Sequence, residues 1–386
     1  MARESDRPTV VFIDSIPWES FCSLAAALRA YGIRSARITA HRRERFQRIV
    51  QQAERVVFGP TQFRISRPED TGEELNVEWE SLTDLLPKGT VDIQASDVLA
   101  AMVLESGDPA ARFLRRVGTG HDPMQLIDKW RAKQLCIDLG IPVPRGWQVC
   151  ESNEFPIVVK ARVGSGGSEV RIAHDHDELA RYWAELTDDE GGTPFLEAFH
   201  LMSTIRFGGV AKDGQLLVGS AYEVIPEAHL PLGPPRAARA IDEPQIVADV
   251  RKLVSATNYT GFISLDYVGD ADGPALANDI NPRAFASWPA LQRAGVDILG
   301  AYVHSLGLGP PPTRGAVDYS TAFNLFTFPL PLAASAHDLR RRHRDEIRLV
   351  RQSRTTMGNI WALLTVARIE SYTVKQLLGR PWLKAQ

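Results

Sequence analysis

The chain has 386 residues, of which 44% are hydrophobic and 24% are charged, so it can bury one large core or several linked cores. Its 44 basic and 47 acidic residues give a formal net charge of -3, which argues against nucleic acid or an anionic membrane as partner and favours small polar substrates. Cys22, Cys136 and Cys150 form no CxxC pair, and the sequence has no run of about eighteen apolar residues. These features argue against a disulfide framework, a thiolate zinc site and a transmembrane segment, and we expect the cytoplasm because the charged start carries no apolar leader.

The first part of the chain alternates between strand and helix patterns. The predicted elements are, in order, strand 10–13, helix 19–31, strand 34–38, helix 42–53, strand 56–58, an irregular polar stretch 59–76, helix 79–86, strand 91–94 and helix 97–105. Such alternation is typical of a parallel sheet flanked by helices. We therefore expect an N-terminal α/β domain over residues 1–118.

The next part, about residues 119–312, has an α+β pattern. Asp122 can cap a helix that runs to Leu139, and Gly140 is placed to terminate it. The predicted elements that follow are extended 141–144, strands 157–160 and 169–172, helix 177–186, a β-rich stretch 195–223, helix 244–256 and strands 262–268 and 275–280. The last two strands are expected to pair antiparallel. Residues 313–386 have a different character, with a helical pattern at 360–378, and we treat them as a C-terminal helical extension.

A lysine at the end of a buried strand is the first chemical motif. Residues 156–160 read Pro-Ile-Val-Val-Lys, and the glycine-rich run Gly164, Ser165, Gly166 and Gly167 follows. Backbone N–H groups of such a loop can approach phosphate oxygens, and lysine supplies a compact positive charge. Taken alone the motif fits a hairpin turn equally well, and it is neither a P-loop nor a GxGxxG fingerprint.

A second motif places polar residues on two apolar strands. Asp279 and Asn281 are two residues apart, so they face the same way on a strand, toward Asp266 on its expected neighbour. Carboxylate and amide oxygens suit magnesium that bridges ATP phosphates, whereas zinc would want histidine or thiolate. A polar hairpin end with Asx turns is the alternative, but it explains less well why both residues interrupt an apolar strand.

In this order the motifs resemble the ATP-grasp superfamily over about residues 121–306. The set that carries the resemblance is Asp128-Lys129, Gly140-Ile141-Pro142-Val143-Pro144, the lysine strand with its glycine loop, Phe195-Leu196-Glu197, and Asp266 with Asp279-Ile280-Asn281-Pro282-Arg283. The resemblance implies an N-terminal α/β pre-ATP-grasp domain followed by a two-lobed ATP-grasp module. Its small lobe, 119–200, would carry the glycine-rich lid, and its large lobe, 201–312, the metal site.

The resemblance also implies roles for single residues. Lys129 and Lys160 would contact ATP phosphates from two sides, and the loop 164–167 would close over them. The hinge strand from Glu197 to Phe199 would hold adenine through its backbone. The magnesium ligands would be Asp266, Asp279 and Asn281, with Mn2+ as an alternative metal, and the acyl phosphate or carboxylate would bind Arg283.

Three positions depart from the commonest family pattern. Aspartate stands at 279 where glutamate is more usual, Ser203 or Thr204 stands where an acid often holds the ribose, and Ser264 stands where the D-alanine–D-alanine ligase branch has arginine. Arg283 after the Asn-Pro pair is more similar to the carbamoyl-phosphate-synthetase-like and amino-acid ligase branches.

Three further features allow two readings each. His174-Asp175-His176-Asp177 could bind metal, but Asp175 with Glu178 resembles a helix capping box, which we favour. Arg236 and Arg239 could bind an anion or belong to a solvated loop. The seven arginines of 340–354 could contact a carrier protein or a membrane surface, but a solvated surface helix is the favoured reading.

The function expected from the sequence is that of an ATP-dependent ligase. A carboxylate would be activated as an acyl phosphate, with Lys160 and Arg283 as catalytic residues, and an amine would then displace phosphate. The partners would be a small-molecule carboxylate and amine, without nucleic acid, and a homodimer is left open. The alternatives are a non-catalytic ATP-binding sensor or scaffold and a phosphotransferase of the same fold.

Overall fold

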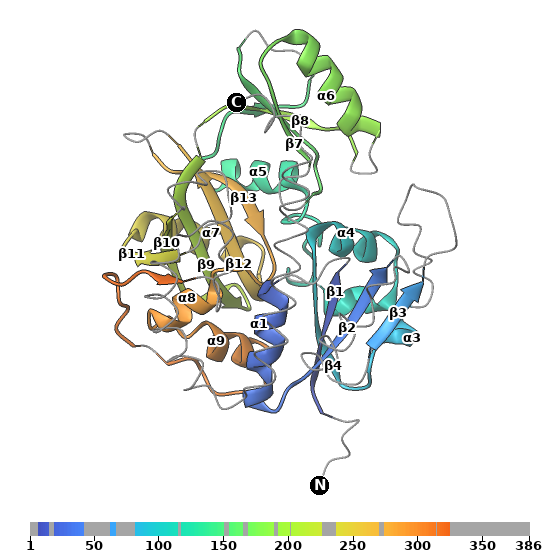
Figure 1. Ribbon diagram of the computed structural model, residues 1–386, viewed down its shortest axis with the longest axis vertical. Helices are drawn as coiled ribbons and strands as arrows, with labels where there is room; N and C mark the ends of the chain where they lie inside the picture. Colours follow the sequence, from blue (N-terminus) through green and yellow to red (C-terminus); the bar gives the residue numbers. More distant parts are fainter. Residues whose placement is uncertain are drawn as a thin grey trace, which may run out of the picture. The chain divides into compact units, whose positions relative to one another are not determined.

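The structure is a computed structural model of the chain. It describes residues 7–14, 19–41, 62–66, 82–114, 117–149, 154–164, 169–188, 192–200, 202–225, 237–269, 274–313 and 315–324. The chain divides into two compact units, one formed by residues 1–77 and 326–386 and the other by residues 78–325. Each unit is described by itself, and Figure 1 gives the labels of the elements.

The first unit contains a parallel βαβ arrangement, as the sequence predicts. Strands β1 (Thr9–Asp14) and β2 (Arg34–His41) pair in parallel, and helix α1 (Glu19–Leu28) with the short 3-10 turn η2 (Arg29–Tyr31) connects them. Gly32 ends this helical segment with a φ of 71°, a conformation that glycine adopts without strain. The rings of Phe12 and Phe21 lie 5.4 Å apart in the core of the unit.

One expectation for this unit is wrong. Residues 62–66 fall in the stretch predicted to be irregular, but they form strand β3 (Gln62–Ser66), which pairs in parallel with β2. Phe63 and Ile65 alternate with polar residues, which is the period-two pattern of a half-buried strand, although it is only five residues long. The predicted helix 42–53 and strand 56–58 lie outside the described residues.

The second unit begins with the helix, strand and helix that the sequence predicts. They are α3 (Leu82–Leu85), β4 (Thr90–Ala95) and α4 (Asp97–Glu105), followed by the 3-10 segment η4 (Pro109–Phe113). Ser96 is the N-cap of α4, and its side chain accepts a hydrogen bond from the N–H of Leu99. This cap fixes where the chain turns from β4 into α4, and so places Asp97 at the first position of the helix.

Helix α5 (Lys129–Asp138) starts later than predicted. Asp128 is its N-cap and accepts from the N–H groups of Trp130 and Arg131 at 3.0 Å, whereas Asp122 accepts from Met124 in a preceding turn. Both aspartates have the chemistry of a cap, but the N–H of Lys129 bonds the carbonyl of Arg162 and so anchors the helix start at 129. Gly140 terminates the segment with a φ of 64°, as predicted.

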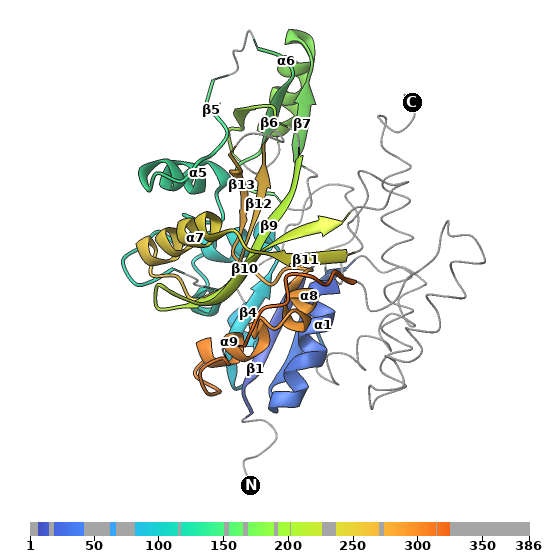
Figure 2. The same cartoon turned by 90° about the vertical axis from the view of Figure 1, so that its left-hand side faces the viewer.

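A small antiparallel sheet follows α5. Its strands β5 (Gly146–Trp147), β6 (Ile157–Lys160), β7 (Val170–Ala173) and β8 (Phe195–Ala198) have the order β5-β8-β6-β7. Helix α6 (His176–Asp188) packs on it through Leu179 and Leu186, which join a core cluster with Ile157 and Val159. Figure 2 shows this sheet and α6 as one lobe of the unit.

The larger sheet has six strands in the order β13-β12-β9-β10-β11-β14. They are β9 (Met202–Lys212), β10 (Gln215–Ile225), β11 (Ala237–Ile241), β12 (Gly261–Val268), β13 (Leu276–Asn281) and β14 (Phe323–Asn324). Strands β12 and β13 pair antiparallel, which confirms the predicted pair. The chain thus combines parallel and antiparallel sheets, so the mixed α/β and α+β prediction is confirmed.

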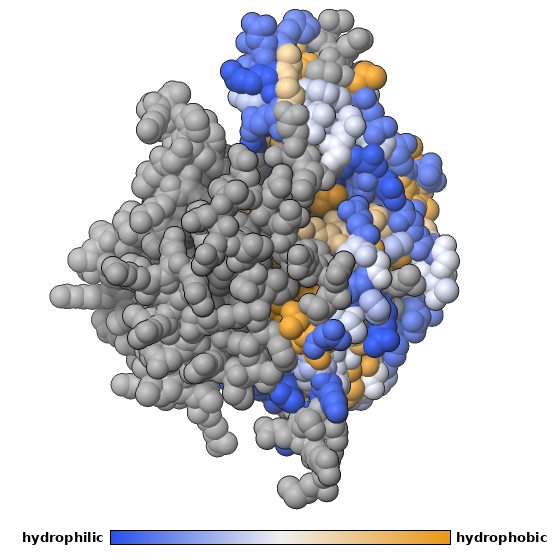
Figure 3. Space-filling model, turned by 90° about the vertical axis from the view of Figure 1, so that its right-hand side faces the viewer, coloured by the Kyte–Doolittle hydropathy of each residue, from blue (hydrophilic) through white to orange (hydrophobic). Residues whose placement is uncertain are grey.

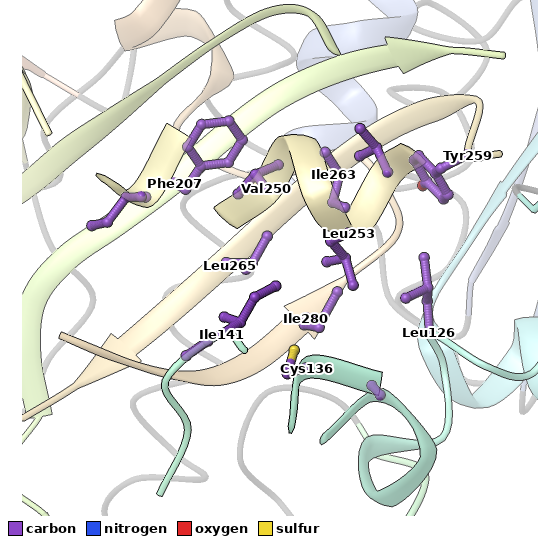
Figure 4. Packing of buried hydrophobic residues seen from close by; sticks show 14 of the residues in the cluster. Leu126, Cys136, Ile141, Phe207, Val250, Leu253, Tyr259, Ile263, Leu265 and Ile280 are labelled. Atoms are coloured by element: carbon purple, nitrogen blue, oxygen red, sulfur yellow. The ribbon is translucent and has the colours of Figure 1, made fainter. Parts of the chain in front are cut away.

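Helices cover both faces of the larger sheet. Helix α7 (Pro244–Ala256) packs Val250 and Leu253 against Ile263 in the core cluster drawn in Figure 4. The neighbouring residue Phe262 points to the opposite face, where its ring lies 4.3 Å from that of Tyr302 on α9 (Ile298–Ser305). Helix α8 (Trp288–Arg293) also packs beside β9 and β11.

A few large apolar side chains are exposed among the described residues. The face in Figure 3 is mostly hydrophilic where it is coloured, with hydrophobic residues scattered between hydrophilic ones. The large exposed apolar side chains are spread along the sequence: Tyr31, Ile137, Val149, Ile172, Leu308 and Tyr319. No helix in the described ranges is long and apolar enough to cross a membrane.

Candidate active site

The carboxylates predicted to hold metal face one another across two strands. Asp266 on β12 stands directly opposite Asp279 on β13 in the antiparallel register, and a bulge follows Asp266. Asn281 lies on the same side as Asp279, and its Nδ2 donates to Asp279 Oδ2 over 3.3 Å. The structure therefore brings together the three oxygen-bearing side chains that the sequence singled out.

Positively charged side chains surround this acidic cluster. Lys129 at the start of α5 forms an ion pair with Asp279, and Arg206 on β9 places its Nε 2.9 Å from Asp266 Oδ1. Arg283 donates from Nη2 to Asn281 Oδ1 over 2.8 Å. The side chains of Lys129 and Arg206 are each 15% exposed, so solvent screens these pairs only partly.

The opposing charges set the protonation of the cluster. Burial acts to raise the pKa of Asp279, but Lys129, Lys160 and Arg283 outweigh it and hold that pKa below its ordinary value. Burial likewise acts to lower the pKa of Lys129, yet Asp279 and Asp97 raise it. Asp266 behaves differently, since burial raises its pKa and the charge of Asp279 adds to this against the effect of Arg206. Asp279 is therefore the more firmly ionised of the two facing carboxylates.

Arg283 is held by residues from the β4–α4 turn. Its Nε lies 3.0 Å from Oδ2 of Asp97, and both side chains are about nine-tenths buried. The next residue, Ala284, donates its N–H to Gln94 Oε1 over 3.1 Å. Gln94 also donates to the buried Asp92, which accepts a 2.5 Å hydrogen bond from the hydroxyl of Tyr302. This buried network connects the end of β13 to β4 and α9, and it restricts the position of the arginine.

Lys160 is buried beside the acidic cluster. It lies at the end of β6, pairs with Glu197 and donates to Asn278 Oδ1 over 2.7 Å. Glu197 was predicted to contribute its backbone, but its side chain also bonds Lys133 of α5 at 2.7 Å. The sequence reasoning missed Lys133, although its place four residues after Lys129 puts both lysines on one face of the helix.

The rest of the predicted nucleotide site is described only in part. Phe199 follows β8 and is half-buried. Gly164 is buried, and a Cβ there would lie 2.5 Å from Glu169 Oε2, so this start of the loop is closely packed. Ser165, Gly166 and Gly167 lie outside the described residues.

Hydrogen bonds support the capping reading of the His174–Asp177 segment. The N–H of Glu178 donates to Asp175 Oδ1 over 2.8 Å, and the N–H of His174 donates to Glu178 Oε2 over 3.0 Å. Asp175 thus caps the helix, and Glu178 reaches back to the N–H before the cap in a variant of the capping box. No group of three or more His, Cys, Asp or Glu side chains could hold a metal ion in the part of the chain that the structure describes. Arg239 pairs with Glu223 at 2.7 Å, while Arg236 and the arginines of 340–354 fall in ranges that are not described.

A pocket of about 520 Å³ lies beside α5, on the side of the helix that does not carry Lys129 and Lys133. Its lining residues are Gly120, His121, Asp122, Gln125, Trp130, Arg131 and Gln134. None of the clustered charged residues lines it, and Arg131 is already engaged with Asp122 and Asp128. We place the functional site at the charged cluster instead, because partly buried side chains of opposite charge converge there from α5, β9, β12 and β13.

Known proteins resemble the chain in sequence over part of its length and in fold. No protein-family model matches the chain. It is 25% identical over 255 residues to the carbamoyl phosphate synthase large chain of Archaeoglobus fulgidus, which covers 60% of this chain and 23% of the relative. The chain thus spans about a quarter of the length of such relatives.

Two solved structures show the same fold at low sequence identity. One is the biotin carboxylase domain of Hydrogenobacter thermophilus 2-oxoglutarate carboxylase, in complex with MgADP and hydrogencarbonate (TM-score 0.57, 16% identity, 81% of this chain and 73% of that chain). The other is N5-carboxyaminoimidazole ribonucleotide synthetase from Thermotoga maritima (TM-score 0.51, 16% identity, 82% and 79%). The chain has the ATP-grasp fold, which confirms the resemblance read from its motifs.

Proposed function

We propose that the chain is an ATP-dependent carboxylate–amine ligase that releases ADP and phosphate. The observation that carries this proposal is the meeting of Asp266, Asp279 and Asn281 on paired strands, within contact of Lys129 and Arg283. A protein that only binds nucleotide has no need of a carboxylate pair at the phosphate end. The relatives, which include a carbamoyl phosphate synthase and two carboxylating enzymes by name, support the same class.

The donor set fits magnesium held jointly by protein and substrate. Two carboxylates and one amide supply hard oxygen ligands, and Mg2+ typically keeps few protein ligands and takes the others from phosphates and water. We assign Asp266, Asp279 and Asn281 to the metal, with Mn2+ as a substitute. When bound there, the metal would neutralise charge on the phosphates and orient them.

The nucleotide would lie between the small sheet and the larger sheet. Lys129 and Lys160 would contact its phosphates, and the strand from Glu197 to Phe199 would border adenine. The loop of Gly164, Ser165, Gly166 and Gly167 would cover the phosphates and keep water out.

The reaction then needs two displacements. An oxygen of the substrate carboxylate attacks the γ-phosphorus, the bond to ADP breaks, and the positive charges of Lys129 and Lys160 offset the charge on the group in transit. The amine nitrogen next attacks the acyl carbon, loses a proton, and phosphate leaves. Arg283 would face this second centre, where its guanidinium would hold the acyl oxygen or the departing phosphate. Asp97 and the Gln94–Ala284 hydrogen bond would keep that guanidinium in place.

The partners proposed are therefore two small molecules, a carboxylate and an amine. A homodimer also stays a proposal, and the related biotin carboxylase domain is a dimer by its own description. Hydrogencarbonate is the first acid to try, because that related domain binds it together with MgADP.

A paired-substrate assay tests the function. Purified protein with MgATP is given hydrogencarbonate or another small carboxylate, ammonium or an amino acid, or one of each, and ADP and phosphate are measured. A ligase releases both products fastest when acid and amine are present together. ADP release with the acid alone, without phosphate, would indicate a phosphotransferase. Tight MgATP binding without product for any pair would indicate a sensor or scaffold and refute the proposal.

A further inference from the structure

A buried glutamate stands between two lysines from different elements. Glu197 on β8 bonds Lys133 of α5 through Oε1, at 2.7 Å, and Lys160 of β6 through Oε2. The three side chains are only 4–6% exposed. Each carboxylate oxygen therefore serves one ammonium group, and the cluster carries one net positive charge when all three groups are ionised.

The charge of this cluster reaches the phosphate end of the proposed site through Lys160. Its Nζ donates to Asn278 Oδ1 over 2.7 Å, and Asn278 directly precedes Asp279. Lys160 thus lies between the hinge carboxylate and the candidate metal ligands.

Gly146 leaves the space that the side chain of Lys133 occupies on its way to Glu197. A Cβ at Gly146 would stand 2.6 Å from Lys133 Cε and 2.9 Å from the carbonyl oxygen of Leu196, so a larger residue there would displace the lysine. Burial lowers the pKa of Lys133, although Glu197 opposes this effect. Burying a second lysine costs solvation free energy that a single Glu197–Lys160 pair would avoid.

We propose that Lys133 is a positioning residue for the nucleotide, which neutralises Glu197 so that the charge of Lys160 remains available to the polyphosphate. The inference rests on the nucleotide site of the proposed function. Without Lys133, Glu197 would pair with Lys160 alone. The charges of these two side chains would then cancel, and the cluster would have no net charge to attract phosphate. The loss of affinity should then grow with the number of phosphates on the ligand, because each phosphate adds negative charge.

The test compares AMP, ADP and ATP, each with magnesium, in calorimetry with the full chain. Lys133→Met should weaken ATP binding on the order of tenfold and AMP binding by less than about twofold, with ADP between them. Lys133→Gln, which keeps a hydrogen-bond donor for Glu197 but removes the charge, should show the same gradient. Lys133→Gln replaces Lys133→Met in the comparison if the methionine variant does not fold.

A double variant that restores the net positive charge of the cluster gives the decisive measurement. The double variant Lys133→Met, Glu197→Gln has one positive charge again, on Lys160, and should recover ATP affinity to within about threefold of wild type. Lys252→Met is the matched control, since Lys252 pairs with the buried Asp249 on α7, away from the cluster. It should leave all three affinities unchanged.

Two results would overturn the inference while leaving the nucleotide site in place. One is an equal loss for AMP, ADP and ATP in Lys133→Met without recovery in the double variant, which would mean a structural role. The other is no loss at all. Failure of the wild-type protein to bind any of the three nucleotides would instead refute the proposed function and the inference with it.

Discussion

Replacing Asp279 by asparagine should abolish turnover and leave a folded protein. The side chain keeps its shape and one hydrogen-bonding oxygen, but it loses the charge that pairs with Lys129 and is assigned to the metal. Removing one such positioned charge typically costs on the order of 10²-fold in rate or more. The nearby Asp266 cannot take over both roles, because Arg206 already contacts it at 2.9 Å.

The sign of the effect on stability follows from the pKa of Asp279. Asparagine removes repulsion with Asp266 but also leaves Lys129 without its carboxylate, and these effects oppose each other. The lowered pKa shows that the fold favours the charged form, so the variant should be less stable at neutral pH. The side chains are 27% and 15% exposed, between the surface and buried cases, which suggests a cost of about 1–3 kcal/mol.

The pH dependence provides an independent check of that sign. A carboxylate with a lowered pKa contributes stability above its unfolded value, about 3.8, and that contribution is lost as the pH falls through the lower folded value. The difference in unfolding free energy between wild type and Asp279→Asn should thus be full at neutral pH and vanish in acid. Urea titrations at several pH values measure it.

The assays are ADP release with the substrates found in the paired screen, thermal unfolding with and without MgADP, and circular dichroism. Asp249→Asn is the control, since it neutralises another buried carboxylate, paired with Lys252 outside the site. It should lose stability but keep turnover. Wild-type activity in a well-folded Asp279→Asn protein would refute the metal assignment.

Three further variants probe other parts of the site. Lys160→Ala should weaken ATP binding more than Lys160→Arg, by about 1.5–3 kcal/mol for the lost charge-assisted bond, and equal calorimetric affinities would show that this lysine does not face phosphate. Arg283→Ala should cut the hydroxamate that hydroxylamine traps from the acyl phosphate by on the order of 10²-fold while sparing ATP affinity, and the reverse pattern would make Arg283 a nucleotide ligand. Tyr302→Phe removes a donor from the buried Asp92 and should cost about 1–3 kcal/mol in urea unfolding, whereas an unchanged midpoint would mean that the hydroxyl is not needed.

Local patterns were sufficient for most of the fold. Alternation of apolar residues with turn residues predicted the parallel β1–α1–β2 unit and the antiparallel β12–β13 pair. The N-cap of α5 was misplaced by six residues, Asp122 for Asp128, because the two aspartates are equally good caps by residue type. What distinguishes them is a hydrogen bond from the N–H of Lys129 to Arg162, a contact that sequence spacing does not reveal.

Within the candidate site, spacing predicted contacts between residues close in sequence but not most contacts between distant ones. The two-residue spacing of Asp279 and Asn281 placed them side by side on one strand. In contrast, Asp97 meets Arg283 across 186 residues, and Lys133 meets Glu197 across 64. Arg206 left a weak signal, since it interrupts an apolar strand beside Phe207, but a single charge in a strand does not identify its partner.

The ion pairs of the candidate site bear on how it would bind MgATP. Lys129 lies on Asp279 and Arg206 lies on Asp266, so the cations and carboxylates already satisfy one another in the described structure. Under the proposed function, the metal would take the carboxylates and the phosphates would take Lys129, so binding would exchange two sets of charge pairs. The free energy of MgATP binding then contains only the difference between the energy of the new pairs and that of the pairs they replace. This difference is smaller than the energy of either set of pairs. Asp97 and Glu197 are outside that exchange because each holds its cation within the protein. The ion pairs of Asp97 with Arg283 and of Glu197 with Lys160 would keep these two cations in position while Lys129 changes partner. Phosphoryl transfer is favoured by charges that are fixed in this way before the reaction begins.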